Sequence, residues 1–349
     1  VLPDRLPIGT EATIDTITPD QFRAFYNAWY RPENTFITLV GDMEPDYAVQ
    51  KIEEFFGDWQ TPEDVEAGVA LELDSAALSE PRARVYSDPE IQTSVTVAMV
   101  KAYEPEADLI QTRKTGLIES LGNSMLNRRL GKLARTEDAA FISASVGRSN
   151  FFDAAEISSL GVNAETGNWA AGLAQGEQAL RRALDYGFTQ AELDEQIANI
   201  ENSMKVAVQT SPTRRTPGLA RGIMGAFSGE RVVTTPDSNL ERFLTLKPEI
   251  TLEAVEAAFR EGWEGLDASP QLYLQTSEMI EDGEAKLEAA YAASKSVEIE
   301  PRAEEATLEF AYTEFGTPGK IVKRERIEDI DATLITFDNN VRLNFKKTS

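Results

Sequence analysis

Adjacent carboxylates are the first side chains in this sequence that could carry out chemistry. Glu53-Glu54, Glu137-Asp138 and Glu304-Glu305 could each form a coupled acid–base pair, because two close carboxylates shift each other's affinity for a proton. Neighbouring residues on a helix, however, do not face each other. We therefore interpret all three pairs as solvated surface.

Two residue types that usually build catalytic sites are missing, because the chain has no His and no Cys. Their absence excludes cysteine nucleophiles, disulfides, thiolate and imidazole zinc ligands, and the Ser-His-Asp triad. The dinucleotide motif G-x-G-x-x-G does not occur, EF-hand spacing is absent, and Gly316 to Lys320 is too short for a P-loop. A site made of carboxylates alone stays open, but by elimination we expect no complete catalytic site in this chain. The sequence therefore assigns no catalytic, no metal-binding and no substrate-binding residue.

Two arginines and one turn are weaker candidates for a site. Arg5 and Arg31 could contact a substrate, but we expect them to pair with carboxylates near the edges of domains. Gly41-Asp42 closes an apolar run, and a glycine in that position is typical of a turn rather than of a site.

Two apolar segments could bind a peptide. Tyr26, Trp29 and Tyr30 could form a peptide-binding wall, although their helical spacing favours a place in the core. The segment Thr93–Val100 could take up a peptide by strand addition if it lay at the edge of a sheet. We expect it to be part of the core instead.

Composition indicates a globular chain of about two domains, from 349 residues, 42% of them hydrophobic and 27% charged. The 34 Lys and Arg residues against 59 Asp and Glu residues give a net charge of −25, which disfavours nucleic-acid and anionic membrane partners. Arg128-Arg129, Arg181-Arg182 and Arg214-Arg215 are too small and scattered to form a binding patch. We therefore expect the negative charge to keep the protein soluble. No apolar run is long enough for a membrane span.

The N-terminal part predicts a helix, a strand and a second helix. Thr18 with Gln21 is a capping box, and the helix it starts carries an aromatic face. Residues 35–40 predict a buried strand, and residues 45–56 a helix with its apolar side chains turned inward.

The remainder predicts a larger mixed domain. Strands are expected at 83–86 and 93–100, a long helix at 108–135, and an antiparallel pair at 140–146 and 155–162. The helical pattern then continues at 168–186, at 189–209 after the capping box Thr189 to Glu192, and in fragments over 211–250.

An internal repeat links the two parts. At an offset of 233 residues (250 − 17), Thr18 aligns with Thr251 and Tyr30 with Trp263, and a strand and an acidic helix follow each helix, at 271–275 and 281–293 in the second copy. The register predicts duplicated domains whose helix, strand and helix superpose. It also predicts that about 150 residues of an earlier domain precede Val1, and the lack of an initiator Met and of a leader agrees with this expectation.

The predicted fold class is therefore α+β, with two-layer domains in which helices cover one face of a mixed, largely antiparallel sheet. The predicted boundaries are the following: 1–60 ends a first domain, 61–81 is a linker, 82–295 is a complete second domain, 296–330 is a linker, and 331–349 is a hairpin that opens a third domain.

These motifs resemble the insulinase/pitrilysin-type zinc metalloproteases, or inverzincins. Arg5 to Thr10, the run Phe25-Tyr26-x-x-Trp29-Tyr30-Arg31-Pro32-x-Asn34 and Val40-Gly41-Asp42 resemble the end of the family's first domain. The later blocks resemble its second and third domains: Asn127-Arg128-Arg129-Leu130-x-x-Leu133, Gly187-Phe188-Thr189-x-x-Glu192-Leu193, and Leu334 to Phe345.

The resemblance implies hydrolysis of peptide bonds in a chamber between two half-shells. In this family zinc is bound by the two His of H-x-x-E-H and by a later Glu, and the Glu between the His activates the zinc-bound water. None of these roles passes to a residue of this chain, which has no His. Zinc is therefore expected in the parent protein and no cofactor in this chain. The resemblance also implies a peptide or small-protein substrate, contacts with the remaining domains of one polypeptide, and a bacterial location, the periplasm being favoured over the cytoplasm.

Three hypotheses remain open at this point. The chain is a non-catalytic section of a zinc metalloendopeptidase, part of the chamber wall. Alternatively, the parent is a catalytically inactive relative that acts as a structural or peptide-binding shell. The third hypothesis is an unrelated acidic scaffold. The sequence upstream of Val1 would discriminate between the first two by the presence or absence of H-x-x-E-H.

Overall fold

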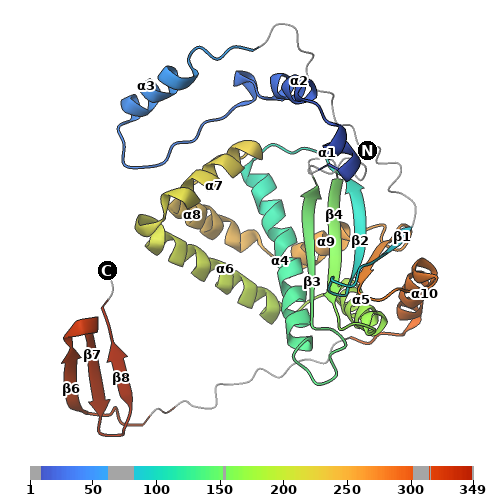
Figure 1. Cartoon of the computed structure of the whole chain (residues 1–349). Coiled ribbons are helices and arrows are strands. Elements are labelled where there is room, and N and C mark those ends of the chain that lie inside the picture. The colour runs from blue at the N-terminus through green and yellow to red at the C-terminus, as the bar shows by residue number, and fades with distance from the viewer. Residues whose placement is uncertain (1–8, 62–81, 152–154, 302–313, 315, 348–349) are drawn as a thin grey trace. The chain divides into compact units, whose positions relative to one another are not determined.

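The computed structural model describes residues 9–61, 82–151, 155–301, 314 and 316–347, in two separate units (Figure 1). The first unit ends at Pro301, and the second comprises the remaining C-terminal residues. The predicted linker 61–81 lies outside the described residues except for Thr61, as do Arg5 and Glu304-Glu305.

A five-stranded mixed sheet organises the first unit, in the order β1-β5-β2-β4-β3 (Figure 1). Its strands are β1 (Arg82–Ser87), β2 (Ser94–Ala102), β3 (Ser143–Phe151), β4 (Ala155–Asn163) and β5 (Gln271–Thr276). Only the β1–β5 pair is parallel, whereas the other three pairs are antiparallel. The predicted α+β class with a mixed, largely antiparallel sheet is confirmed.

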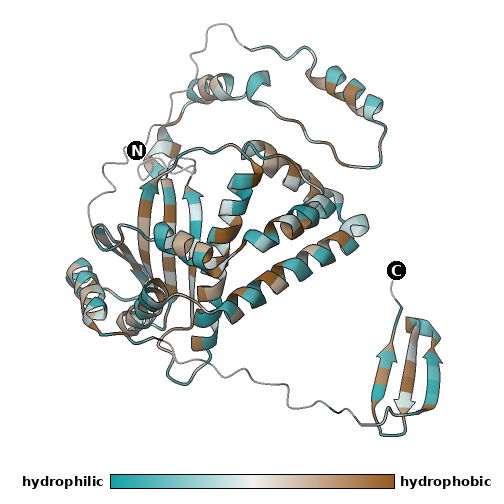
Figure 2. Cartoon of the chain, turned by 180° about the vertical axis from the view of Figure 1, so that it is seen from behind, coloured by the Kyte–Doolittle hydropathy of each residue, from teal (hydrophilic) through white to brown (hydrophobic). Residues whose placement is uncertain are grey.

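Helices cover one face of this sheet. Hydrophobic and hydrophilic residues alternate along its strands (Figure 2), and buried positions alternate with more exposed ones, so one side of each strand faces the helices. The covering helices are α4 (Ile110–Leu133), α5 (Trp169–Tyr186), α9 (Leu252–Gly262) and α10 (Gly283–Ser296). The core between the two layers includes Val95, Leu121, Leu160, Leu173 and Leu274, all fully buried.

Beyond α4, three further helices extend the unit: α6 (Gln190–Thr210), α7 (Thr216–Ser228) and α8 (Pro236–Leu246) (Figure 1). The capping box of Thr189 and Glu192 that the sequence predicts is formed at the start of α6. A short 3-10 turn at Ser211–Thr213 separates α6 from α7, and another at Lys247–Glu249 follows α8. Pro212 and Pro248 interrupt the helical pattern there.

Gly122 allows α4 and α9 to pack closely. A Cβ atom on Gly122 would lie 2.9 Å from the Cβ and from a ring carbon of Phe259, so only glycine fits at this contact. Phe259 is buried and its ring also meets Phe188 edge-on, with centroids 5.2 Å apart. The glycine that weakens α4 as an isolated helix therefore brings two helices of the covering layer together.

The N-terminal segment forms the two predicted helices, α2 (Pro19–Trp29) and α3 (Pro45–Phe56), and an unpredicted short helix, α1 (Glu11–Thr16). The capping box of Thr18 and Gln21 is present. The expectation that the aromatic faces lie in a core is wrong, since Phe25, Trp29 and Phe55 are exposed. No described helix or strand packs on these faces, and an amphipathic helix is buried only where a second apolar surface meets it.

The strand predicted at residues 35–40 is also absent, because this segment is extended but pairs with no described strand. Its counterpart in the repeat, β5, lies between β1 and β2. The two copies therefore agree in their capped helices and differ in the strand, so the predicted superposition fails there.

The second unit is a three-stranded antiparallel sheet of β6 (Ile321–Ile327), β7 (Ala332–Phe337) and β8 (Arg342–Phe345). The predicted hairpin corresponds to β7 and β8. Assigning residues 321–327 to a linker is wrong, because they form β6 against β7. No helix in the described part of the chain combines the length and apolarity needed to cross a bilayer.

Candidate functional site

The face of the five-stranded sheet that the helices leave uncovered is the candidate functional surface, and we call it the open face. Register defines its rows, because residues directly opposite each other share a face. One row runs through Arg84, Tyr273, Thr96, Gly161 and Ser145. A second row runs through Tyr86, Gln275, Ser94, Asn163 and Ser143.

The open face is polar and accessible. Tyr86 and Tyr273 are 52% and 42% exposed, and the remaining positions of the two rows are half-buried or exposed hydroxyl, amide, guanidinium or glycine positions. Such groups offer many hydrogen-bond donors and acceptors beside two aromatic rings, which suits a polypeptide in varied orientations. A serine in this set has no adjacent general base of the histidine type, since the chain has no His. The surface can bind but has no activated nucleophile of that kind.

Asn127 closes part of one edge of the sheet. Its side-chain amide accepts a hydrogen bond from the Val146 N–H at 2.7 Å and donates one to the Val146 carbonyl at 2.9 Å. A neighbouring strand would make the same two bonds, so the amide of α4 takes the place of a sixth strand at this point of β3.

Arg129, the second residue after Asn127, joins the two sequence blocks predicted to characterise the second domain. Its guanidinium donates two hydrogen bonds of 2.7 Å to the carboxylate of Glu192 and lies 4.7 Å from the centroid of the Phe188 ring. A bidentate pair combined with a cation–π contact fixes α4 against the start of α6. The block Asn127-Arg128-Arg129 and the block Gly187 to Glu192 are therefore two halves of one structural junction.

The charge of Glu192 is stabilised within this junction. Burial acts to raise the pKa of its carboxyl, but hydrogen bonds from Arg129 and from the Thr189 backbone, with the charge of Arg129, outweigh it and leave the pKa below its usual value. The carboxylate thus remains ionised and serves both as the capping group of α6 and as the partner of Arg129.

Gly187 makes the turn that presents Phe188 and Thr189. Its φ of +71° lies in the left-handed region, and a Cβ atom there would collide with the carboxylate of Glu256. That carboxylate accepts a hydrogen bond from the Phe188 N–H at 2.8 Å. Glycine is therefore required both by the backbone conformation and by the close approach of Glu256.

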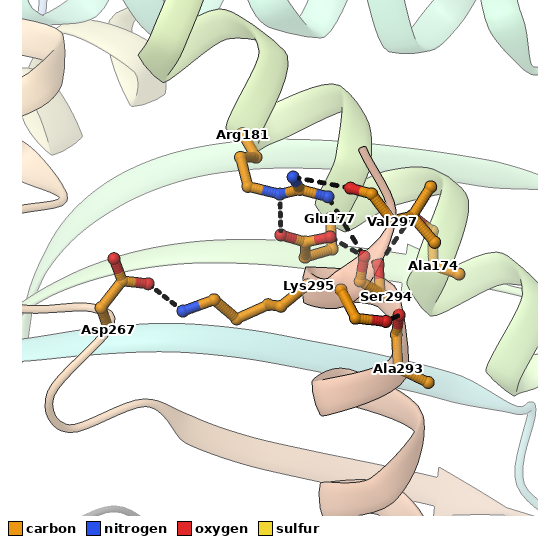
Figure 3. Close-up of polar contacts among 9 residues, drawn as sticks. Ala174, Glu177, Arg181, Asp267, Ala293, Ser294, Lys295 and Val297 are labelled. Atoms are coloured by element: carbon orange, nitrogen blue, oxygen red, sulfur yellow. Dashed lines mark hydrogen bonds and ion pairs between the residues drawn. The ribbon is translucent and has the colours of Figure 1, made fainter. Parts of the chain in front are cut away.

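A second polar cluster lies between α5 and the C-terminal end of α10 (Figure 3). Glu177 is buried on α5; it accepts a hydrogen bond of 2.5 Å from Ser294 Oγ and one of 2.9 Å from Arg181 Nε. The guanidinium of Arg181 also donates to the carbonyls of Ser294 and Val297 at the end of α10. This network satisfies the terminal carbonyls of α10 and fixes that helix against α5.

The cluster does not have the character of an acid–base site. The Glu177 carboxylate is held by Arg181 and Ser294 (Figure 3), and it is buried on α5, which covers the opposite side of the sheet from the open face. Burial, followed by the nearby charge of Glu177, raises the pKa of Tyr291 far above its usual value, so this phenol stays protonated. We assign the cluster to the attachment of α10.

Among the residues that the structure describes, no three His, Cys, Asp or Glu side chains come close enough to hold a metal ion. The carboxylates of Glu177, Glu192 and Asp108 are hydrogen-bonded to arginines instead. A shallow hollow of 480 Å³ lies beside Ser87 and Asp282, where β1 meets the start of α10.

Some of the candidate residues lie where the sequence predicts them, and others do not. Arg31 is buried and pairs with Glu33 at 3.4 Å, as expected. Gly41-Asp42 lies at a bend, and Glu53-Glu54 and Glu137-Asp138 are exposed, as expected for surface. Tyr26, Trp29 and Tyr30 are exposed rather than in a core. Residues 93–100 fall largely in β2, a central strand with partners on both sides, so strand addition there is excluded.

The sequence did not indicate the rows of the open face. Their residues come from five strands whose pairing joins positions nearly 190 residues apart, such as Arg84 and Tyr273. Polar residues at alternate positions, such as Ser94 and Thr96 in β2, indicate which side of each strand is exposed. Only the strand order shows that these residues form rows across the sheet.

The sequence of this chain is similar to those of known proteins. The sequence model described as the peptidase M16 inactive domain matches residues 16–200, just over half of the chain. The probable zinc protease PqqL of Escherichia coli K12 is 43% identical over 51 residues, which is 15% of this chain and 6% of that protein. A PQQL-like zinc protease of Arabidopsis thaliana is 28% identical over 145 residues, 41% of this chain and 15% of that protein.

A solved structure gives the same fold. The crystal structure of the periplasmic protease PqqL from Escherichia coli aligns with 99% of this chain at a TM-score of 0.72 and 17% identity, and the alignment covers 38% of the PqqL chain. The chain therefore spans well under half the length of these relatives.

Proposed function

The chain belongs to the peptidase M16 family, and on that premise we propose that it is a non-catalytic section of a zinc metalloendopeptidase that walls the space enclosing a peptide substrate. The observation that carries this proposal is the open face. One side of the five-stranded sheet carries none of the helices that the structure describes, and it presents Tyr86, Tyr273 and rows of hydroxyl and amide groups. A wall of this kind contacts peptide chains of varied sequence without cleaving them.

Zinc does not fit the residues of this chain. Two relatives are named zinc proteases, but the chain offers no His and no Cys, and its described residues gather no three carboxylates. Zinc prefers nitrogen and sulfur ligands in a tetrahedral site. In this proposal the metal and the hydrolytic step belong to another part of the parent polypeptide, and the carboxylates of this chain take no step in it.

The N-terminal helices support the same proposal. The exposed aromatic faces of α2 and α3, around Phe25 and Phe55, need an apolar partner that the described residues do not supply. We propose that residues 1–60 end a first domain, that 82–295 form the non-catalytic second domain, and that 331–349 open a third. The remaining domains of one polypeptide would then cover α2 and α3.

The cellular location proposed for the parent is the bacterial periplasm. It rests on the solved relative, which is described as a periplasmic protease and shares the fold at 17% identity. Fractionation of the native host, with detection of the parent protein in the periplasmic extract, tests this location.

The experiment that tests the function compares three polypeptides with quenched fluorescent peptides: residues 1–349, the chain extended on its N-terminal side, and the full-length parent. The expected result is cleavage by the full-length parent, abolished by a chelator, and no cleavage by residues 1–349. Chelator-sensitive cleavage by residues 1–349 alone would contradict the proposal. A full-length parent that binds no zinc and cleaves nothing would favour an inactive family member that serves as a structural or peptide-binding shell.

A further inference from the structure

Three exposed side chains follow one another along α7: Arg221, Met224 and Phe227. Residues three apart are neighbours on a helix surface, so these side chains form a continuous line, which we call the α7 stripe. Met224 and Phe227 are 51% and 57% exposed, whereas Leu219 and Ile223 of the same helix are partly buried. The stripe thus lies on the side of α7 that no described element packs against closely.

A fixed apolar loop adjoins the stripe. The Asp108 carboxylate accepts a hydrogen bond from the Val232 N–H at 2.7 Å and binds Arg113 through both oxygens, and Arg113 donates to the Val232 carbonyl at 2.9 Å. Val232 is nevertheless 65% exposed, and Leu109, beside Asp108, is 61% exposed. Exposed apolar side chains whose backbone is held in place by polar contacts are typical of a binding surface.

The stripe lies in a basic stretch of an acidic protein. Residues 205–231 contain five basic residues (Lys205, Arg214, Arg215, Arg221 and Arg231) and one acidic residue (Glu230), a local charge of +4 in a chain of −25. Lys205 pairs with Glu201 at 2.6 Å, but within the described ranges Arg215 and Arg221 form no ion pair with a carboxylate. These two guanidinium groups, one at the start of α7 and one on the stripe that includes Phe227, complement an anionic ligand with an apolar group.

One aromatic side chain already occupies part of the stripe. The ring of Phe36 stacks on the ring of Phe227, with centroids 3.8 Å apart and an interplanar angle of 5°. Phe36 belongs to the extended segment at residues 35–40, which has no strand partner among the described residues and is followed by Asp42, Glu44 and Asp46. An extended apolar segment with acidic residues is therefore the kind of chain that meets Phe227 here.

We propose that the α7 stripe binds extended acidic peptide segments that carry an aromatic residue, the aromatic ring stacking on Phe227 and the carboxylates pairing with Arg221 and Arg215. This inference rests on the proposed function and names the substrate class that a peptide-enclosing section would hold at this helix. A polypeptide is favoured over an anionic membrane because the group seen on Phe227 is the side chain of an extended peptide segment.

Binding is measured on the whole chain by fluorescence anisotropy, so that the result is independent of peptidase activity. The probe is a fluorescein-labelled peptide with the sequence of residues 33–44, which contains Phe36 and three carboxylates. A second peptide replaces its acidic residues with Lys, and a third replaces its Phe with Ala. Vesicles containing phosphatidylglycerol test the membrane alternative.

Removing one or the other ring of the Phe36–Phe227 stack should change peptide binding in opposite directions. In the protein, F227A and R221E should each weaken binding of the acidic peptide about tenfold, as expected for a central aromatic and a paired charge. F36A should tighten binding, because it frees Phe227. The matched controls are R324E, which makes the same charge change in the second unit, and F25A, which removes an equally exposed ring; both should leave binding unchanged. Circular dichroism verifies that each variant is folded.

Two results would overturn the inference. The first is equal or tighter binding of the Lys peptide, or binding that F227A and R221E do not change. The second is R221E-sensitive binding of vesicles with no binding of the acidic peptide, which would make α7 a membrane-facing helix. Neither result would affect the cleavage assay of the three polypeptides, so this inference and the proposed function can fail separately.

Discussion

Arg129 and Glu192 form a bidentate pair with two hydrogen bonds of 2.7 Å, although 63 residues separate them in the chain. The same Glu192 carboxylate accepts a hydrogen bond from the Thr189 N–H at 2.9 Å. One side chain therefore completes the capping box of α6 and pairs this helix with α4. Removal of Glu192 takes away this link between the two helices and half of the capping box.

The first prediction concerns this pair. E192A should lower the free energy of unfolding by about 3 kcal/mol, because it leaves a largely buried guanidinium without its carboxylate partner and removes the hydrogen bond that the Glu192 side chain accepts in the capping box. Urea denaturation followed by circular dichroism measures the change. The control is E195A, which breaks the more exposed pair with Arg128 and should cost about 1 kcal/mol or less. Equal losses in the two variants would contradict the prediction.

The second prediction concerns pH. Because the folded chain holds the pKa of Glu192 below its usual value, the unfolded chain binds more protons as pH falls through the ordinary range of Glu, near about 4.3. The stability contributed by the ionised carboxylate is fully present above that range and is lost as pH falls through the lowered pKa. The difference in urea midpoint between the native chain and E192Q should therefore be largest at pH 7 and narrow below pH ~4. If the difference in urea midpoint grew as the pH fell, the pKa of Glu192 would be raised by folding rather than lowered, and the prediction would be wrong.

The third prediction concerns glycines of α4. G122A should destabilise the chain by about 1–3 kcal/mol, because the added methyl group would meet Phe259 at 2.9 Å. G116A and G131A are matched controls in the same helix, where an added Cβ has no atom within 4 Å. Each control should stabilise by about 0.5–1 kcal/mol through helix propensity. Thermal unfolding of the three variants checks this contrast, and a stabilised G122A would refute the close α4–α9 contact.

The fourth prediction concerns Ser294. S294A removes the hydrogen bond to the buried Glu177 carboxylate and should cost about 1–3 kcal/mol. Ser296, two residues further along, bonds only to the exposed backbone carbonyl of Ala293, so S296A should change stability by less than about 0.5 kcal/mol. Denaturant unfolding at neutral pH compares the two. A neutral S294A would mean that Glu177 is satisfied by Arg181 alone.

The fifth prediction concerns metal. Residues 1–349, incubated with zinc and passed through gel filtration, should retain far less than one zinc per chain, because carboxylates alone are poor ligands for zinc. Elemental analysis of the protein peak measures the ratio. One tightly held zinc per chain would reveal a carboxylate site and would contradict the assignment of the metal to another part of the parent.

Local signals in the sequence predicted local structure well. Thr18 with Gln21 and Thr189 with Glu192 are capping boxes in the structure, because the residues that form each cap lie within one turn of each other. The helices and the strands of the large sheet are close to the positions that periodicity predicts. The mixed, largely antiparallel sheet was also expected.

Features that depend on distant partners were not predictable in the same way. The aromatic face of α2 has the spacing of a core helix, yet Phe25 and Trp29 are exposed, because spacing reports which side can be buried and not what is there to bury it. The strand β6 was not predicted, because all but its last residue are exposed and its sequence has no pattern of buried residues. It is defined only by its pairing with β7. The open face depends on strand order, which no single segment encodes.

The amide of Asn127 has a consequence for the ageing of the protein. Slow deamidation to aspartate would replace the –NH₂ donor with a second acceptor oxygen, which would then face the Val146 carbonyl that it now satisfies. The N–H of Val146 would keep an acceptor, but its carbonyl would lose its donor and meet a negative charge. That single change would open this stretch of β3 to pairing with the strand of another molecule.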